Sequence, residues 1–152
     1  MQNENLGKLS VTILRLPVVV GPNQGLDNPI SIFCKEAMKP VPVSVFNGGL
    51  HRRKFLHVED LVRCVISCGT LTGDEKTNVK IFNMPGFVTD MNGIIKEITS
   101  CGIDVSVDYK SSNTQAFSLV SDHTTFEKQF GAICSYDIRS MVTEFIEEGV
   151  KK

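Results

Sequence analysis

The chain has 152 residues, of which 41% are hydrophobic and 22% charged, and this usage suits one compact domain and excludes a disordered or fibrous protein. The 16 Lys and Arg side chains nearly balance the 17 Asp and Glu, so a formal net charge of -1 provides no positive field for nucleic acid or an anionic membrane. Residues 1–10 lack the apolar core of a signal peptide, and no apolar run reaches membrane-spanning length. We therefore expect a soluble, cytoplasmic protein that binds neither nucleic acid nor membrane.

The five cysteines fit a reducing cytoplasm, because their odd number and their spacing match neither a small disulfide scaffold nor a zinc site. Cys64 and Cys68 lie four residues apart on a predicted helix and could present two thiolates on one face. No second pair or neighbouring His completes a tetrahedral set around them. We interpret both as small buried hydrophobic side chains and expect no metal.

The first predicted elements are a strand and a helix. Residues 11–20 are nearly continuously apolar and β-branched, which is typical of a strand buried on both faces of a parallel sheet, although Pro17 limits its hydrogen bonding. A helix is predicted over residues 30–39, with Asn28 as its cap and Pro29 at its opening.

Residues 41–46 and 53–58 are predicted to form two short strands on either side of the turn signal Asn47-Gly48-Gly49, and we expect them to pair with each other. Helical spacing of apolar residues predicts a helix over 59–71, followed by a solvated loop over 72–78.

The remaining predicted elements alternate in the same way. They are strands over 79–84, 104–109 and 117–120, a helix between its expected cap Thr89 and Cys101-Gly102, and two final helices over 122–130 and 137–150. This alternation of strands and helices predicts an α/β fold built in layers.

Three segments of the sequence carry a resemblance to a known family. Residues 13–22 end in Gly-Pro after an apolar strand, residues 52–60 read Arg-Arg-Lys-Phe-Leu-His-Val-Glu-Asp after the glycine turn at 48–49, and Asp-His-Thr at 122–124 precedes Phe-Gly at 130–131. In this order they resemble the extended short-chain dehydrogenase/reductase family of nucleotide-sugar epimerases and dehydratases. That family has a late strand ending in Gly-Pro, an Arg-Asp-aromatic-Ile-His-Val-x-Asp stretch and a later Asp-x-Ser-Lys segment that closes with Leu-Gly.

The resemblance covers almost the whole chain and implies a single unit over residues 1–152, the C-terminal, substrate-binding portion of such an enzyme. This portion would combine late strands of a Rossmann-like parallel sheet with a small α/β substrate-binding domain. The family's glycine fingerprint and its Tyr-x-x-x-Lys do not occur in the sequence, so we expect the N-terminal dinucleotide-binding half to be absent.

Catalytic chemistry is therefore not expected from this chain alone. The loop at 21–25 lacks the glycine spacing that lets a pyrophosphate approach closely, and neither Tyr109 nor Tyr136 has a lysine one turn away. The resemblance implies NAD or NADP as cofactor of the full-length parent, and we expect this chain to bind neither and to have no catalytic residue of its own.

The resemblance also implies a diphosphate site. Arg53 matches the family arginine that binds the substrate diphosphate, a role suited to its permanently charged planar fork, and the alternative is a surface arginine. Lys54 replaces the family's usual Asp and either widens the anion site or lies in solvent. Asn28 corresponds to a family asparagine that hydrogen-bonds the diphosphate, although helix capping explains it equally well.

A nucleobase pocket is implied at the next strand, where Ser44, Val45 and Phe46 match the family's pocket lining. The alternative is that Phe46 is a core side chain. We expect His57 and Asp60 to be scaffold, with Asp60 at a helix start.

Two departures from the family pattern reduce the number of contacts expected with the diphosphate. Val18 stands where many epimerases have an asparagine, and residues 111–115 lack the family's second phosphate arginine. The expected function is the nucleotide-sugar-binding portion of an NAD(P)-dependent epimerase, dehydratase or reductase. Its expected partners are a nucleoside-diphosphate sugar and either the missing N-terminal half or a second copy of itself. The alternative is a non-catalytic binding or structural module of the same fold.

Overall fold

The computed structural model describes residues 11–70, 79–113 and 115–150, so the predicted loop over 72–78 lies outside the described residues. The helices are α1 (Pro29–Ala37), α2 (Val58–Gly69), α3 (Met91–Ser100), α4 (Thr124–Phe130) and α5 (Ile138–Val150), with a 3-10 turn at Asn47–Gly49. The strands are β1 (Val11–Arg15), β2 (Val18–Val20), β3 (Val43–Phe46), β4 (Arg52–His57), β5 (Val79–Asn83), β6 (Phe87–Thr89), β7 (Val107–Lys110) and β8 (Ser118–Leu119).

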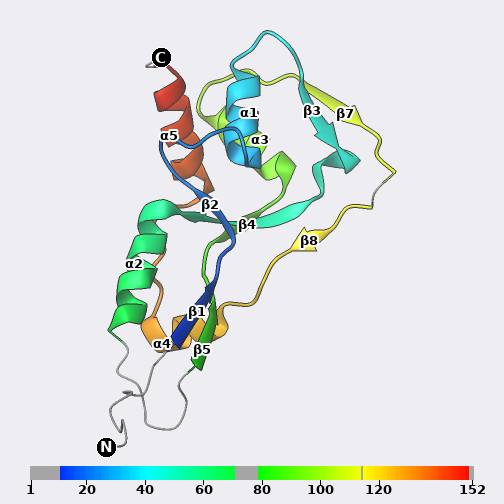
Figure 1. The fold of residues 1–152 in the computed structure, drawn as a ribbon. Helices are drawn as coiled ribbons and strands as arrows, with labels where there is room; N and C mark the ends of the chain where they lie inside the picture. The colour runs from blue at the N-terminus through cyan, green and yellow to red at the C-terminus, as the bar shows by residue number, and fades with distance from the viewer. Residues whose placement is uncertain (1–10, 71–78, 114, 151–152) are drawn as a thin grey trace, which may run out of the picture.

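The predicted α/β fold is confirmed, with the strands divided among three small sheets. β1 pairs with β5 and β3 pairs with β7, both in parallel. In the third sheet β4 lies between β2 and β6 and also pairs with β8. Figure 1 shows β2 and β4 crossing the middle of the molecule, with α1, α3 and α5 to one side and β1, β5, α2 and α4 to the other.

The single strand predicted over residues 11–20 is wrong, because the chain breaks at Leu16 and Pro17 into β1 and β2. Proline has no backbone N–H to give to a ladder, so the two segments enter different sheets. Within the described residues β1 and its partner are also not covered on both faces. Ile13 of β1 is 43% exposed and Ile81 of its partner β5 is 47% exposed.

The expected pairing of the strands on either side of the glycine turn is also wrong. Asn47, Gly48 and Gly49 have φ values of 53°, 63° and 75°, all in the left-handed region. This 3-10 turn lets β3 and β4 diverge: β3 pairs with β7, whereas β4 joins the central sheet.

Helix starts follow their local capping residues. Asn28 caps α1 as predicted, with Oδ1 accepting hydrogen bonds from the N–H groups of Ile30 and Ser31. The cap of α3 is Asp90 and not Thr89, because Asp90 Oδ1 accepts the N–H of Gly93 at 2.8 Å. Thr89 instead ends β6, a three-residue strand too short to be predicted from its pattern.

The two hydrophobic clusters meet across β4. Phe55 belongs to a cluster formed with α1, β3, α3 and α5, while its neighbour Leu56 belongs to a second cluster formed with α2, β5 and α4. Successive side chains of a strand point to opposite faces, so one strand serves both clusters. Cys64 and Cys68 lie buried in the second cluster, as predicted, and all five cysteines are free thiols.

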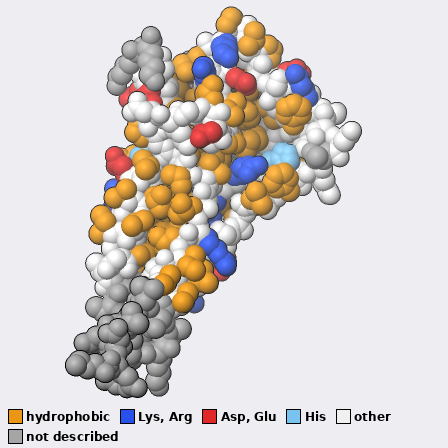
Figure 2. All heavy atoms as spheres, in the orientation of Figure 1, with side chains coloured by type: hydrophobic (Ala, Val, Ile, Leu, Met, Phe, Trp, Pro, Cys, Tyr) orange, Lys and Arg blue, Asp and Glu red, His pale blue; other side chains and the backbone are white. Residues whose placement is uncertain are grey.

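The helices of the described part of the chain lack the combination of length and apolar character that crossing a lipid bilayer requires. Hydrophobic side chains nevertheless gather on the surface over α2 (Figure 2). We call this set the α2 apolar face: Val58, Val62, Val65 and Ile66, which are 36%, 52%, 48% and 63% exposed.

Candidate functional site

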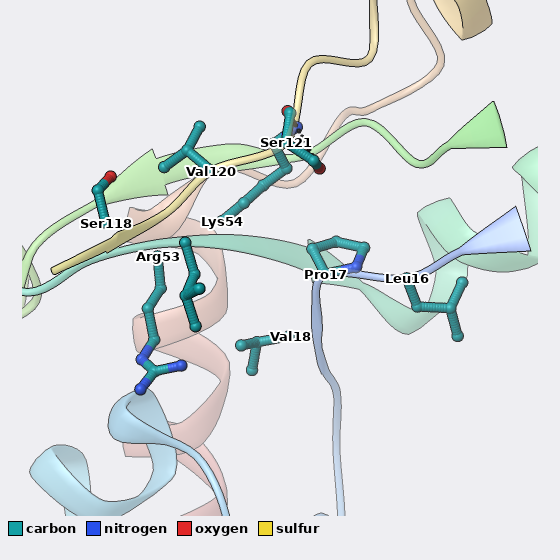
Figure 3. Close-up of a pocket in the computed structure, with 9 residues that line it drawn as sticks. Leu16, Pro17, Val18, Arg53, Lys54, Ser118, Val120 and Ser121 are labelled. Carbon is teal, nitrogen blue, oxygen red and sulfur yellow. Dashed lines mark hydrogen bonds between the residues drawn. The ribbon is translucent and has the colours of Figure 1, made fainter.

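A cavity of about 590 Å³ opens beside the middle of β4 (Figure 3). Its walls come from the β1–β2 connection, from β4, and from β8 with the residues that follow it. We call it the Arg53 cavity, and its lining residues are Leu16, Pro17, Val18, Arg53, Lys54, Ser118, Leu119, Val120 and Ser121. The structure thus brings Arg53 and Val18 together, as the family resemblance implied, and Val18 makes that part of the wall apolar.

Arg53 is half-buried, and its guanidinium lies over the ring of Phe117, 5.4 Å from the ring centroid. Among the described residues, no carboxylate lies within salt-bridge distance of it. An arginine held by an aromatic face and left without a counter-ion can offer its N–H fork to an anion.

Lys54 fits neither of the two expected roles. Its side chain leaves β4 in the direction opposite to that of Arg53 (Figure 3), and the residue is only 2% exposed. The Nζ donates to the backbone oxygen of Ser121 and lies 2.9 Å from Nδ1 of His123. Burial lowers the pKa of Lys54, while the negative charges of Asp122 and Glu127 oppose this shift. The amine therefore links β4 to residues 121–123 and is not in solvent.

A second cavity, of about 380 Å³, lies between α1, β3 and the start of β4. We call it the β3 slot, and its lining residues are Ile32, Phe33, Glu36, Ser44, Phe46, His51 and Met91. Phe46 is 51% exposed, so it is not a core side chain, whereas Val45 is buried in the first hydrophobic cluster. Of the three predicted pocket residues, Ser44 and Phe46 therefore present side chains to the slot.

Aromatic contacts link a residue of the β3 slot to Arg53. The rings of His51 and Phe117 meet edge to face with centroids 4.7 Å apart, and the Arg53 guanidinium lies over the Phe117 ring. The N–H of Phe117 also donates to Nδ1 of His51. Sequence reasoning missed both His51 and Phe117, because they come from separate segments that only the fold brings together.

Asn28 lies apart from both cavities and lines neither of them. It is 2% exposed, its Oδ1 is occupied by the helix cap, and its Nδ2 donates to Oε1 of Gln24 at 3.0 Å. These contacts explain Asn28 as the N-cap of α1.

His57 is fully buried at the end of β4. Its Nε2 lies 2.9 Å from Oε2 of Glu144, and its ring stacks on Tyr136 with centroids 3.8 Å apart. The Tyr136 hydroxyl donates to Glu59, and this hydrogen bond raises the pKa of Tyr136. These contacts tie α5 and the preceding loop to β4 and α2, which is a scaffold role.

Asp60 is also fully buried, in the first turn of α2. Burial by itself would raise the pKa of this carboxyl. Hydrogen bonds from the N–H groups of Ser135 and Tyr136, and from the side chains of Arg63 and Ser135, outweigh burial and lower the pKa. Asp60 therefore anchors residues 135–136 and caps no helix.

The loop at residues 21–25 makes two contacts with other parts of the protein. A Cβ on Gly21 would lie 2.5 Å from Cγ1 of Val58, so this glycine permits close packing against α2. The N–H of Asn23 already donates to the carboxylate of Glu148. The described residues also contain no group of three or more His, Cys, Asp or Glu side chains suited to a metal ion.

Comparison with known proteins gives a family and a fold. The sequence profile of the NAD dependent epimerase/dehydratase family matches residues 2–83. MoeE5 in complex with UDP-glucuronic acid and NAD superposes with a TM-score of 0.77 at 24% identity, over 94% of this chain and 48% of that chain. A search of curated proteins finds no significant match.

Two further solved structures have similar folds. The Thermotoga maritima UDP-glucose 4-epimerase with UDP-glucose has a TM-score of 0.74 at 24% identity, over 92% of this chain and 46% of that chain. The Bacillus cereus UDP-glucuronic acid 4-epimerase with UDP-glucuronic acid and NAD has a TM-score of 0.77 at 17% identity, over 92% of this chain and 45% of that one. The chain therefore spans about half the length of the structures it resembles.

Proposed function

Because this chain belongs to the NAD dependent epimerase/dehydratase family, we propose that it forms the part of an NAD(P)-dependent epimerase, dehydratase or reductase that binds the nucleoside-diphosphate sugar. Residues 1–152 would act as one unit in this role. The solved structures with the same fold include complexes with UDP-glucose and UDP-glucuronic acid, which supports this class of ligand.

The observation that carries the proposal is the position of Arg53 in the wall of the Arg53 cavity, without a carboxylate partner among the described residues. Its guanidinium would donate two parallel hydrogen bonds to diphosphate oxygens. The base would enter the β3 slot, with Phe46 as an apolar wall, and the sugar would extend into the Arg53 cavity. Phe117 limits the rotation of the guanidinium and so keeps it directed at the diphosphate.

A second candidate, a non-catalytic module of the same fold, is favoured by two residues of the Arg53 cavity. Val18 offers no hydrogen bond, and the Lys54 amine is engaged by Ser121 and His123. Arg53 would then be the main cationic group for the diphosphate, and one arginine makes fewer charged hydrogen bonds than two arginines would. Weak ligand binding by the complete protein, without turnover, would favour this candidate.

The binding partner proposed for the α2 apolar face is a dinucleotide-binding half, in the same or a second polypeptide. β1 pairs on one edge only within the described residues, and both Ile13 of β1 and Ile81 of its partner β5 are exposed. An open sheet edge beside apolar surface is a site where further strands add. That half would supply the NAD or NADP site and the catalytic residues, and the free thiols suit a reducing compartment such as the cytoplasm.

Calorimetric titration with UDP-glucose, UDP and glucose tests the binding role. We expect UDP-glucose and UDP to bind and glucose alone not to bind, because the diphosphate contact supplies most of the affinity. Inorganic pyrophosphate should compete with UDP. If no nucleoside diphosphate binds, whatever its base, the proposed function is wrong.

The absence of turnover by the chain alone is tested with UDP-glucose and NAD. Hydride transfer needs a positioned nicotinamide, and the sequence lacks the family's glycine fingerprint and its Tyr-x-x-x-Lys. Epimerases and dehydratases return the hydride to the sugar and leave no net NADH, so the nucleotide sugar itself is also analysed. We expect neither NADH absorbance nor a changed nucleotide sugar from pure protein, and either signal would show that the chain carries a complete active site.

A further inference from the structure

Both apolar and polar side chains line the β3 slot. Three residues on one face of α1 line it, namely Ile32, Phe33 and Glu36, and they face Ser44 and Phe46 of β3. Apolar side chains provide a surface for a flat base, and the polar groups determine which base edge can be bound.

The backbone of β3 offers one free edge. The N–H of Val43 donates to the oxygen of Ser106 at 2.8 Å, on the side of β7. Because successive residues of a strand alternate in direction, the N–H and C=O groups of Ser44 and Phe46 point to the other edge. Within the described residues no other strand pairs with β3, so these groups can meet a ligand.

Glu36 adds a negative acceptor to the slot. Its residue is half-buried, and its carboxylate makes no hydrogen bond or ion pair within the described part of the chain. A carboxylate accepts hydrogen bonds and cannot donate them while ionised. A base that presents carbonyl oxygens to Glu36 would therefore be repelled, and a base that presents N–H groups would be held.

From these groups we infer that the β3 slot selects guanine, so that the nucleotide sugar of the proposed function, on which this inference rests, is a guanosine-diphosphate sugar. On its Watson–Crick edge guanine presents one acceptor, O6, and two adjacent donors, N1–H and the 2-amino group. A β3 backbone N–H matches the acceptor, and the Glu36 carboxylate matches the two donors together. Uracil and thymine place a carbonyl on each side of their single N–H, so one carbonyl would face the carboxylate.

Calorimetric titration of the chain with GDP, UDP, dTDP and ADP tests base selection without any contribution from a sugar. We expect GDP to bind at least about tenfold more tightly than UDP, a difference of ~1.4 kcal/mol. In Glu36→Gln the amide can donate as well as accept, so the preference should fall below about threefold. Glu147→Gln, on the exposed surface of α5, is the matched control and should retain the preference.

The outcomes separate the two levels of the proposal, and thermal melts establish that each variant is folded. UDP binding as tightly as GDP, with both weakened in Arg53→Ala, would overturn guanine selection and leave the nucleotide-binding role in place. A GDP preference unchanged in folded Glu36→Gln would also overturn the role of Glu36. Failure of all four diphosphates to bind would overturn the proposed function, and the inference with it.

Discussion

Nζ of Lys54 lies 2.9 Å from Nδ1 of His123, and this contact joins the central strand to the segment that forms one wall of the Arg53 cavity. His123 Nε2 lies 3.2 Å from Oε1 of Glu127, so a chain of polar contacts runs from β4 into α4. A lysine at this position is buried and partnered, although the surrounding sequence resembles a motif that has an aspartate there.

Exchange of Lys54 should therefore affect folding more than ligand affinity. Lys54→Asp would bury a carboxylate facing Asp122 and Glu127, and we expect it to lower the free energy of unfolding by about 3 kcal/mol. Lys54→Met keeps the apolar stem and should cost less than ~1.5 kcal/mol. Urea denaturation measures both, and Arg52→Asp, at an exposed position of the same strand, is the control. Equal stability of Lys54→Asp and Arg52→Asp would contradict burial of Lys54.

Arg53→Ala should weaken binding of the preferred nucleoside diphosphate by about 1.5 to 3 kcal/mol, because a charge-assisted and bidentate contact is lost. Arg53→Lys should recover only part of this loss, since an ammonium group keeps the charge without the planar fork. Calorimetric titration gives the affinities, and Arg52→Ala provides a neighbouring control with an exposed arginine. If Arg52→Ala and Arg53→Ala weaken binding equally, the effect is one of general charge and not of a specific contact.

Asp60→Ala should lower the free energy of unfolding by about 3 kcal/mol at pH 7, because it leaves the N–H groups of Ser135 and Tyr136 without their acceptor. The pKa of Asp60 is lowered in the folded state. Its contribution to stability is therefore complete above the ordinary pKa of about 3.9 and is lost as the pH falls through the lowered value. Urea denaturation at pH 7 and pH 3 should show the deficit of the variant shrinking at low pH. Asp104→Asn, at an exposed position, should match the unaltered chain at both.

The buried thiols should make the protein less stable in alkali. Burial raises the pKa of both Cys34 and Cys64 to about 12, whereas thiols of the unfolded chain ionise near about 8.5. Between these values the unfolded state loses protons that the folded state keeps, so the free energy of unfolding falls by ~1.4 kcal/mol per pH unit for each thiol. Urea denaturation between pH 8 and 11 should show a shallower slope for Cys64→Ala. An identical slope would mean that the thiol is accessible in the folded state.

The α2 apolar face should make the chain self-associate when no partner covers it. Light scattering over a concentration series should show an apparent mass that rises with concentration. Val62→Glu combined with Ile66→Lys should lower that mass, because it places charges on the face, while Lys96→Glu on α3 should not. A concentration-independent monomer for the unaltered chain would contradict the association.

The elements that local sequence determines are those whose cause lies within a few residues. Asn28 followed by Pro29 predicted the start of α1, because a cap and a fixed φ act on the adjacent backbone. The periodicity that places Cys64 and Cys68 on one face of α2 predicted their burial in the same way. The motif around Arg53 located the candidate diphosphate site, since it depends on residue types at a fixed spacing along one strand.

Tertiary structure decided the features that depend on contacts distant in sequence. Nothing near Lys54 indicates that Ser121 and His123 will surround its amine, and nothing near Arg53 indicates Phe117 beside it. Strand partners are equally non-local, because β3 pairs with β7, about 60 residues later, and not with β4, its neighbour in sequence. The energy of strand pairing depends on the tertiary surroundings of each strand. The sequence therefore determined the start of α1 and the position of the candidate arginine on its strand, whereas the surroundings of each site residue exist only once the chain has folded.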